Sequence, residues 1–197
     1  IVSHKRIQAL PAGLHPKRQG LYFFYVSFFT PNKTLFHMLK YVNHDIVFQE
    51  FPDEVTLAIN LSLCPNGCPG CHSAYLQGNV GDELTEERLR AILDNYIGEI
   101  TCVGFMGGDN DPARVMQLAR MVQETYAGKL HTGWYSGRSK LPEEFQPEAL
   151  NYVKLGPYRA DSGPLKERTT NQRLYRIRHE AVESGKYLED ITHRFWR

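Results

Sequence analysis

The chain has 197 residues, of which 42% are hydrophobic and 23% charged, values that fit one globular domain with a real core. Its 23 Lys and Arg residues against 22 Asp and Glu residues leave a net charge of +1, so the charge balance favours neither a polyanionic partner nor a membrane surface. The four cysteines are grouped as three plus one, unlike the paired spacing of a secreted disulfide framework. A metal or cluster site in a reducing compartment is the better interpretation.

The first part of the chain differs in composition from the rest. No Asp or Glu occurs before Asp45, although Lys and Arg do. The apolar segment Leu21 to Phe29 follows two basic residues, as in a secretion signal, but it is far shorter than the ~20 apolar residues that span a bilayer. We therefore interpret residues 1–37 as an extension of doubtful relevance and residues 38–197, starting at Met38, as a single domain.

Apolar patterning predicts strands that alternate with helices. Strands are expected at Val55–Leu63, Ile100–Met106, Leu130–Tyr135 and Tyr152–Leu155, and helices at Thr85–Tyr96, Pro112–Tyr126 and Gln146–Leu150. This alternation is typical of a parallel sheet with right-handed crossovers, in which ligands bind at the carboxyl ends of the strands. The predicted fold class is α/β.

The sequence CPNGCPGCH directly follows the first predicted strand and holds Cys64, Cys68 and Cys71. Its prolines and glycines prevent a helix and let the backbone fold around a compact object. A zinc site would need a fourth ligand, either His72, which is awkwardly adjacent to Cys71, or a distant residue such as His131. A four-iron cluster held by three cysteines would keep one iron open for a substrate or cofactor.

The second predicted strand ends in Gly107-Gly108-Asp109. Such a sequence is usually only a turn, but it follows a strand and lies downstream of the cysteines. Because the carboxyl ends of parallel strands meet at one edge, we expect this turn beside the cysteine loop. Cys102, within the same strand, is expected to be a buried small apolar residue rather than a ligand.

The spacing Cys-x3-Cys-x2-Cys after the first strand resembles the radical S-adenosylmethionine superfamily, and CPGC resembles its activating proteins of anaerobic ribonucleoside-triphosphate reductase. Gly70 departs from the aromatic residue that many relatives carry. The resemblance extends to GGDND at 107–111, TGWYSG at 132–137, KLGPY at 154–158 and TTNQRLY at 169–175. It implies a partial (βα) barrel with an open, mostly parallel sheet, of the radical S-adenosylmethionine type.

The resemblance also implies the cofactors and the chemistry. One 4Fe-4S cluster would be held by Cys64, Cys68 and Cys71, and S-adenosyl-L-methionine would bind its open iron. One electron from the reduced cluster would cleave this cofactor, and the 5′-deoxyadenosyl radical would take hydrogen from a glycine of the reductase. The backbone of Gly70, Cys71 and His72 would contact the adenine, and Gly107 and Gly108 the methionine part. The Asp109 carboxylate is suited either to the ammonium group of the cofactor or to fixing its own turn.

The implied partners are the large glycyl radical subunit of the reductase and a flavodoxin-like or similar electron donor, in the cytoplasm. No nucleic-acid or membrane partner is expected. Two alternatives stay open: another radical S-adenosylmethionine enzyme, acting as a different glycyl radical enzyme activase or on a small molecule, and a non-enzymatic zinc-binding module with three cysteines and one histidine. Colour separates them, since an iron protein prepared without oxygen is brown and a zinc protein is colourless.

We predict that residues 1–37 are dispensable, because they carry no motif and differ in composition from the domain. A chain that begins at Met38 should bind as much iron and stay in solution as well as the full chain. Iron analysis and circular dichroism after anaerobic purification would measure this. Loss of folding in the shorter chain would instead show that Leu21 to Phe29 packs onto the domain.

Overall fold

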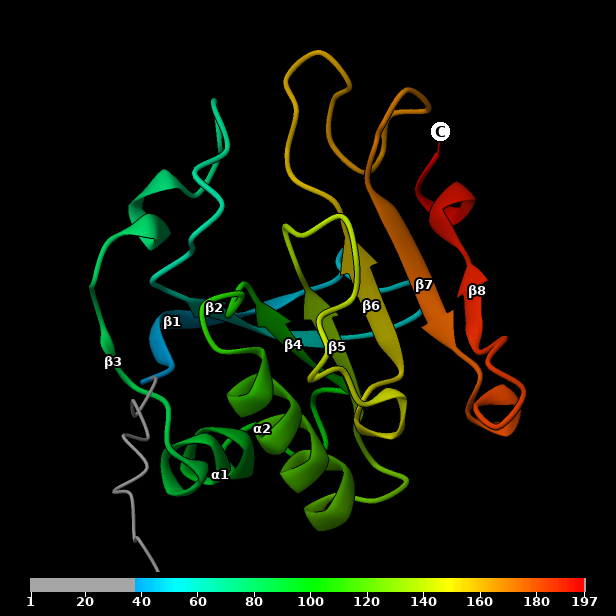
Figure 1. Cartoon of the computed structure of the whole chain (residues 1–197). Helices are drawn as coiled ribbons and strands as arrows, with labels where there is room; N and C mark the ends of the chain where they lie inside the picture. Colours follow the sequence, from blue (N-terminus) through cyan, green and yellow to red (C-terminus); the bar gives the residue numbers. More distant parts are fainter. Residues whose placement is uncertain (1–37, 197) are drawn as a thin grey trace, which may run out of the picture. The chain divides into compact units, whose positions relative to one another are not determined.

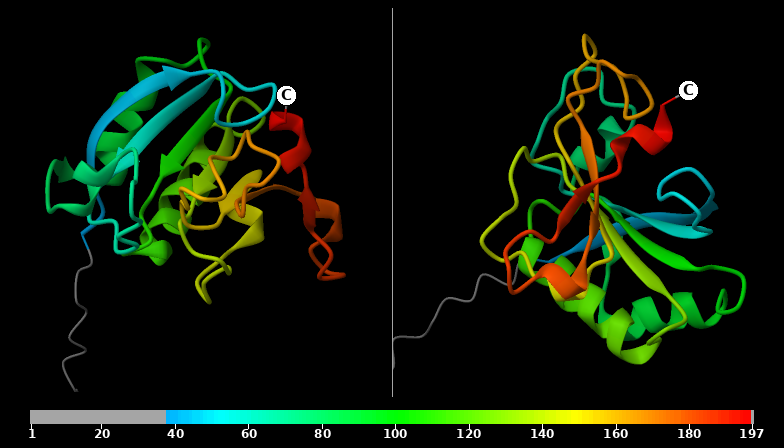
Figure 2. Two further views of the ribbon diagram at one scale, coloured as in Figure 1. Left: turned by 90° about the horizontal axis from the view of Figure 1, so that it is seen from above. Right: turned by 90° about the vertical axis from the view of Figure 1, so that its right-hand side faces the viewer.

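The computed structural model describes residues 38–196, in which eight strands form one sheet. The strands are β1 (Lys40–Val47), β2 (Thr56–Leu61), β3 (Asp82–Glu83), β4 (Cys102–Met106), β5 (His131–Tyr135), β6 (Tyr152–Leu155), β7 (Arg173–Ile177) and β8 (Leu188–Asp190). The described part of the chain also contains two α-helices, α1 (Glu86–Asp94) and α2 (Pro112–Thr125). Both lie on one face of the sheet (Figures 1 and 2). Short 3-10 helices cover Ala74–Gln77, Pro147–Ala149, His179–Ala181 and Thr192–Phe195.

The sheet is open and mixed, with the strand order β3-β1-β2-β4-β5-β6-β7-β8. Its centre confirms the predicted parallel arrangement, because β2, β4, β5 and β6 pair in parallel. The expectation of a mostly parallel sheet is wrong: among the described strands three pairings are parallel, whereas β1-β2, β1-β3, β6-β7 and β7-β8 are antiparallel. The four outer strands are short or partly exposed, so their apolar patterns are too weak for prediction from sequence.

Both α-helices begin at side-chain caps. The Thr85 hydroxyl accepts a hydrogen bond from the backbone N–H of Arg88 at 3.1 Å, and the Asp111 carboxylate accepts one from the N–H of Arg114 at 3.1 Å. Pro112 occupies the first turn of α2, where no intrahelical N–H bond is lost. The predicted helix at Gln146–Leu150 is only a 3-10 turn at Pro147–Ala149. Three residues are too few to form an α-helical turn with its own buried face.

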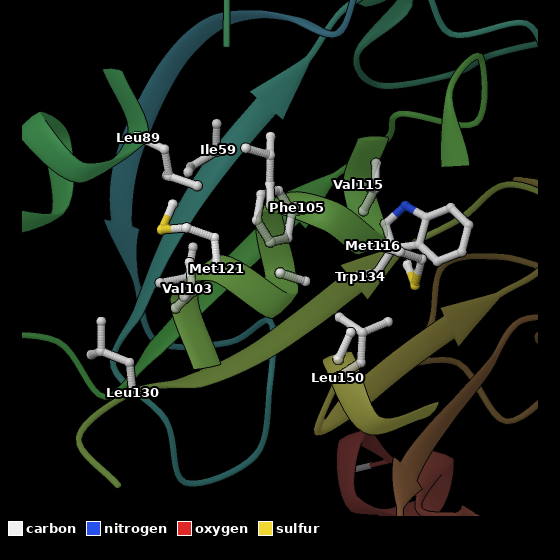
Figure 3. Packing of buried hydrophobic residues seen from close by; sticks show 14 of the residues in the cluster. Ile59, Leu89, Val103, Phe105, Val115, Met116, Met121, Leu130, Trp134 and Leu150 are labelled. Atoms are coloured by element: carbon white, nitrogen blue, oxygen red, sulfur yellow. The ribbon is translucent and has the colours of Figure 1, made fainter. Parts of the chain in front are cut away.

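The main core lies between the sheet and the two helices (Figure 3). Val103 and Phe105 of β4 and Trp134 of β5 are fully buried there, against Met116 of α2 and Leu89 of α1. Burial of a large apolar side chain stabilises a fold by about 1.5–3 kcal/mol. The indole N–H of Trp134 also donates to the carbonyl of residue 107 at 2.7 Å. The core therefore fixes the turn that follows β4 as well as the helices.

The opposite face of the sheet carries a smaller cluster around Phe51, which lies in the connection from β1 to β2. Its ring is fully buried, stacks on Tyr152 with centroids 5.2 Å apart and meets Tyr135 edge-on at 5.3 Å. Gly104 and Gly133 are paired neighbours on β4 and β5, and a Cβ atom at Gly133 would collide with the Phe51 ring. The two glycines thus create the space that this ring fills.

The described residues begin at Met38, so the predicted extension 1–37 lies outside them. None of the helices within residues 38–196 has the length and apolar character needed to cross a membrane.

We predict that Gly133→Ala lowers the free energy of unfolding by about 1–3 kcal/mol, because the added methyl group overpacks the space held by Phe51. The midpoint of urea unfolding, at an unchanged slope, would measure the loss. Gly78→Ala is the matched control, since its Cβ would meet its nearest atom at 3.5 Å, an ordinary contact, and its φ of −73° suits alanine. Equal stability of the Gly133 variant and the unchanged chain would contradict the packing described here.

Candidate functional site

The cysteine loop begins directly after β2, at the carboxyl end of a central parallel strand. Leu63 has a φ of +61°, a left-handed conformation that is costly for a residue with a side chain, and it turns the chain out of the sheet. The backbone N–H of Cys64 donates to the carbonyl of Leu76 at 3.0 Å, and that of Leu63 donates to Gly78 at 3.1 Å. These bonds close residues 64–76 into a loop with fixed ends.

Cys64, Cys68 and Cys71 all line one cavity of about 970 Å³ on the face of the sheet opposite the helices. This volume is at the upper end of the range of small-molecule sites, ≈ 300–1,000 Å³. None of the three cysteines forms a disulfide with another described residue, and each is half-buried. The rest of the lining comes mainly from β1, β2, the connection between them, the ends of β4 and β5, and β6 with the connection that follows it.

The three cysteines suit an iron–sulfur cluster better than they suit a single metal ion. Within residues 38–196, no three His, Cys, Asp or Glu side chains form a group that could hold one metal ion. Three cysteine ligands of a four-iron cluster bind three different iron atoms, so they need to surround one space rather than one point. Three thiols around a shared cavity meet that requirement in the identity and the placement of their donors.

The structure brings some of the predicted cofactor residues into the cavity and leaves others outside it. Gly107 and His72 line the cavity together with Cys71, whereas Gly70, Gly108 and Asp109 lie outside its lining. Gly108 has a φ of +88°, and a Cβ there would approach the side chain of Val115 to 2.6 Å. Packing of the turn against α2 therefore explains that glycine.

The Asp109 carboxylate is almost fully buried, with 1% of its surface exposed. It accepts hydrogen bonds from Ser136 Oγ at 2.6 Å, from the N–H of Gly137 at 2.8 Å and from Asn66 Nδ2 at 2.5 Å. Arg138 Nε lies 3.9 Å from one carboxylate oxygen. The sequence left two roles open for Asp109: binding the ammonium group of the cofactor or fixing its own turn. These hydrogen bonds support the second role.

Lys154, which the sequence analysis did not select, contributes a buried cation to the same cavity. Its Nζ donates to the carbonyl of Gly156 at 3.0 Å and lies 5.5 Å from the centroid of the Tyr135 ring. Burial lowers the pKa of the Lys154 ammonium to about 8, although the negative charges of Asp109 and Cys68 oppose the decrease. Its place at the end of a predicted parallel strand was the signal that could have identified it.

The TTNQRLY segment, for which the sequence gave no role, fixes the connection between β6 and β7. Asn171 Nδ2 donates to the carbonyl of Pro157 at 2.9 Å, and Gln172 Nε2 donates to that of Gly156 at 3.3 Å. Gln172 and Tyr158 both line the cavity. This connection therefore forms one wall of the site, close to the cysteine loop.

A second polar cluster lies at the opposite, amino ends of the parallel strands. Glu54 is buried and accepts hydrogen bonds from His131 Nδ1 at 2.6 Å and from the Tyr152 hydroxyl at 2.9 Å. Burial and the bond to Glu54 raise the pKa of Tyr152 to about 12. His131, considered above as a distant zinc ligand, is thus engaged away from the cysteine loop. Cys102 is fully buried nearby, as expected, and burial raises the pKa of its thiol.

Comparison with known proteins adds no relative. No family model, curated protein or solved structure matches the chain. The resemblance drawn from the motifs therefore stays a prediction, and any functional conclusion rests on the residues and their geometry.

We predict that Cys68→Ala abolishes most iron and sulfide binding, because two thiolates cannot hold a four-iron cluster in a defined orientation. Iron and sulfide content and the visible absorption after anaerobic reconstitution would measure the loss. Cys102→Ala is the control: it removes a buried thiol outside the cavity and should keep the cluster at a cost in stability of about 1 kcal/mol. Full iron and sulfide content in the Cys68 variant would refute the assignment of the ligands.

Proposed function

We propose that this chain reductively cleaves S-adenosyl-L-methionine at a 4Fe-4S cluster and generates a glycyl radical on anaerobic ribonucleoside-triphosphate reductase. One observation carries the proposal: Cys64, Cys68 and Cys71 reach a common cavity from a loop at the carboxyl end of a parallel strand, and Gly107 reaches it from the neighbouring strand. The finer fold assignment, a partial (βα) barrel of the radical S-adenosylmethionine type, belongs to the same proposal. The reducing cytoplasm suits such a centre.

In this proposal the residues of the chain bind the cluster and S-adenosylmethionine, orient them and shield them from water. When bound, the cluster supplies the electron that breaks the bond between the sulfonium and C5′ of the cofactor. Gly107 lines the cavity with a φ of +101°, a conformation that favours glycine, and its backbone is proposed to contact the methionine part of the cofactor. Lys154 offers a buried ammonium group to a ligand carboxylate, and the backbone of Gly70 to His72 is proposed to contact the adenine. The Phe51 cluster closes the sheet face beneath the cavity and excludes water there.

A peptide is the substrate that best suits the mouth of this cavity. Phe48 and Tyr75 belong to its lining yet expose 71% and 53% of their surfaces, so apolar contact area remains for a partner. A glycine in a flexible loop meets the chemical requirement, because its Cα radical is stabilised by the flanking amides and is not hindered by a side chain. The large subunit of the reductase is the proposed source of that loop, and a flavodoxin-like or similar protein the proposed electron donor.

Another radical S-adenosylmethionine enzyme, acting on a small molecule, is the second candidate. The cavity volume of about 970 Å³ favours it, since this value reaches the upper end of the range for small-molecule sites. The zinc-binding module is the remaining alternative and would yield a colourless protein.

The test is to mix the reduced chain, S-adenosylmethionine and the reductase without oxygen and to record the electron paramagnetic resonance spectrum. We expect a glycyl doublet, together with 5′-deoxyadenosine and methionine. The doublet should be absent with the Cys68→Ala variant or when the target glycine of the reductase is replaced. Cofactor cleavage that proceeds with a small molecule while the reductase stays free of radical would support the second candidate instead.

A further inference from the structure

The hydrogen-bonding capacity of the Asp109 carboxylate is used within the protein. A carboxylate offers about four lone-pair sites on its two oxygens. One oxygen accepts from Asn66 and from the N–H of Gly137, and the other accepts from Ser136 and lies near Arg138. A ligand ammonium would have to displace one of these donors, although only 1% of the Asp109 surface is exposed. The carboxylate is therefore committed to its protein partners.

One of these partners belongs to the cysteine loop. Asn66 lies between Cys64 and Cys68, and its Nδ2 is 2.5 Å from the Asp109 carboxylate and 3.6 Å from Cys64 Sγ. The carboxylate accepts only, so the side-chain nitrogen of Asn66, not its oxygen, has to face it. The second hydrogen of the same NH2 group is then available to the sulfur. Asn66 thus connects a fixed carboxylate to a proposed cluster ligand.

The surroundings of Asn66 are shaped to receive it. A Cβ atom at Gly137 would collide with the Asn66 side chain, and Gly137 has no left-handed φ that would require glycine for another reason. Arg138 donates from its guanidinium to the Asp109 carbonyl at 2.7 Å, and its own carbonyl accepts from the N–H of Gly156 at 2.7 Å. The segments after β2, β4, β5 and β6 are joined through this one carboxylate and its neighbours.

We propose that Asp109 is a positioning residue that holds the cysteine loop in place through Asn66 and directs an N–H of Asn66 onto the sulfur of Cys64. The inference rests on the proposed function only in what the cysteines bind; the anchoring of the loop concerns the metal-free chain as well. In the loaded protein the same N–H would contact a cluster ligand, and hydrogen bonds to the sulfurs are one of the factors that set the reduction potential of a cluster.

The rate at which Cys64 reacts with iodoacetamide in the reduced, metal-free full chain tests the proposal, with mass spectrometry to assign each labelled cysteine. The rate is compared on its high-pH plateau, where the Cys64 thiol is fully ionised, because loss of the N–H donor would by itself reduce the thiolate fraction at lower pH. There we expect Asn66→Ala to increase the Cys64 rate by about tenfold or more, since the thiolate loses a hydrogen bond and the loop is released from Asp109. Gly137→Ala should give a similar increase, because it excludes the Asn66 side chain while Asp109 and Asn66 stay present. Cys102 labelling should remain slow in both variants, since that thiol is buried in the folded domain.

Three variants of acidic residues separate positioning from general stability. Asp109→Asn should label nearly as slowly as the unchanged chain, because the amide oxygen can still accept from Asn66 and Gly137 while the amide nitrogen faces the Ser136 hydroxyl. Asp109→Ala should label as fast as Asn66→Ala. Asp111→Asn is the matched control: it removes a charge from the same turn but keeps an N-cap, and should leave Cys64 labelling unchanged.

Unchanged Cys64 labelling in Asn66→Ala and Gly137→Ala would overturn the proposal. So would an equal increase at Cys102, because that result would show general loss of structure. Since this experiment contains neither iron nor S-adenosylmethionine, its outcome is independent of the glycyl radical test. Anchoring of the loop can hold in a chain that produces no radical, and it can fail in a chain that does.

Discussion

The arrangement of the candidate site depends on the parallel pairing of β2, β4, β5 and β6. Because these strands run in the same direction and in register, the segments that leave them emerge at one edge of the sheet. The cysteine loop, the Gly-Gly-Asp turn, the segment Ser136 to Arg138 and the connection after Lys154 are all such segments. Residues up to 43 positions apart in the chain are thereby brought within hydrogen-bonding distance, as the contacts of Asp109 with Asn66 and Gly137 show.

The two faces of the sheet differ in what they pack against. The helix-covered face holds the larger core, with Phe105 and Trp134 at its centre, and makes that layer of the structure rigid. The other face has only the smaller cluster around Phe51 and leaves room for the cavity beside it. Alternation along each strand produces this division: Trp134 enters the core, while its neighbour Tyr135 lines the cavity.

Two buried carboxylates join the parallel strands, one at each end. A buried charge is costly unless hydrogen bonds compensate it, and both Asp109 and Glu54 are well supplied with donors. Asp109 joins the segments at the carboxyl ends, and Glu54 joins His131 and Tyr152 at the amino ends. The first of these lies beside the cysteine loop, so the stability of that loop and the geometry of the site depend on the same bonds.

The sequence by itself determined the central elements and the three cysteines of the candidate site. Thr56–Leu61 and Pro112–Thr125 have strong local signals, an apolar strand pattern in one case and a capped amphipathic helix in the other. The cysteine spacing is also local, so it predicted a ligand set before any fold was known. Only the tertiary structure decided the antiparallel outer strands, the place of Lys154 in the cavity and the commitment of Asp109 to Asn66. Each of these depends on which distant segments become neighbours, and that information is absent from local patterns because it arises from the packing of the whole sheet.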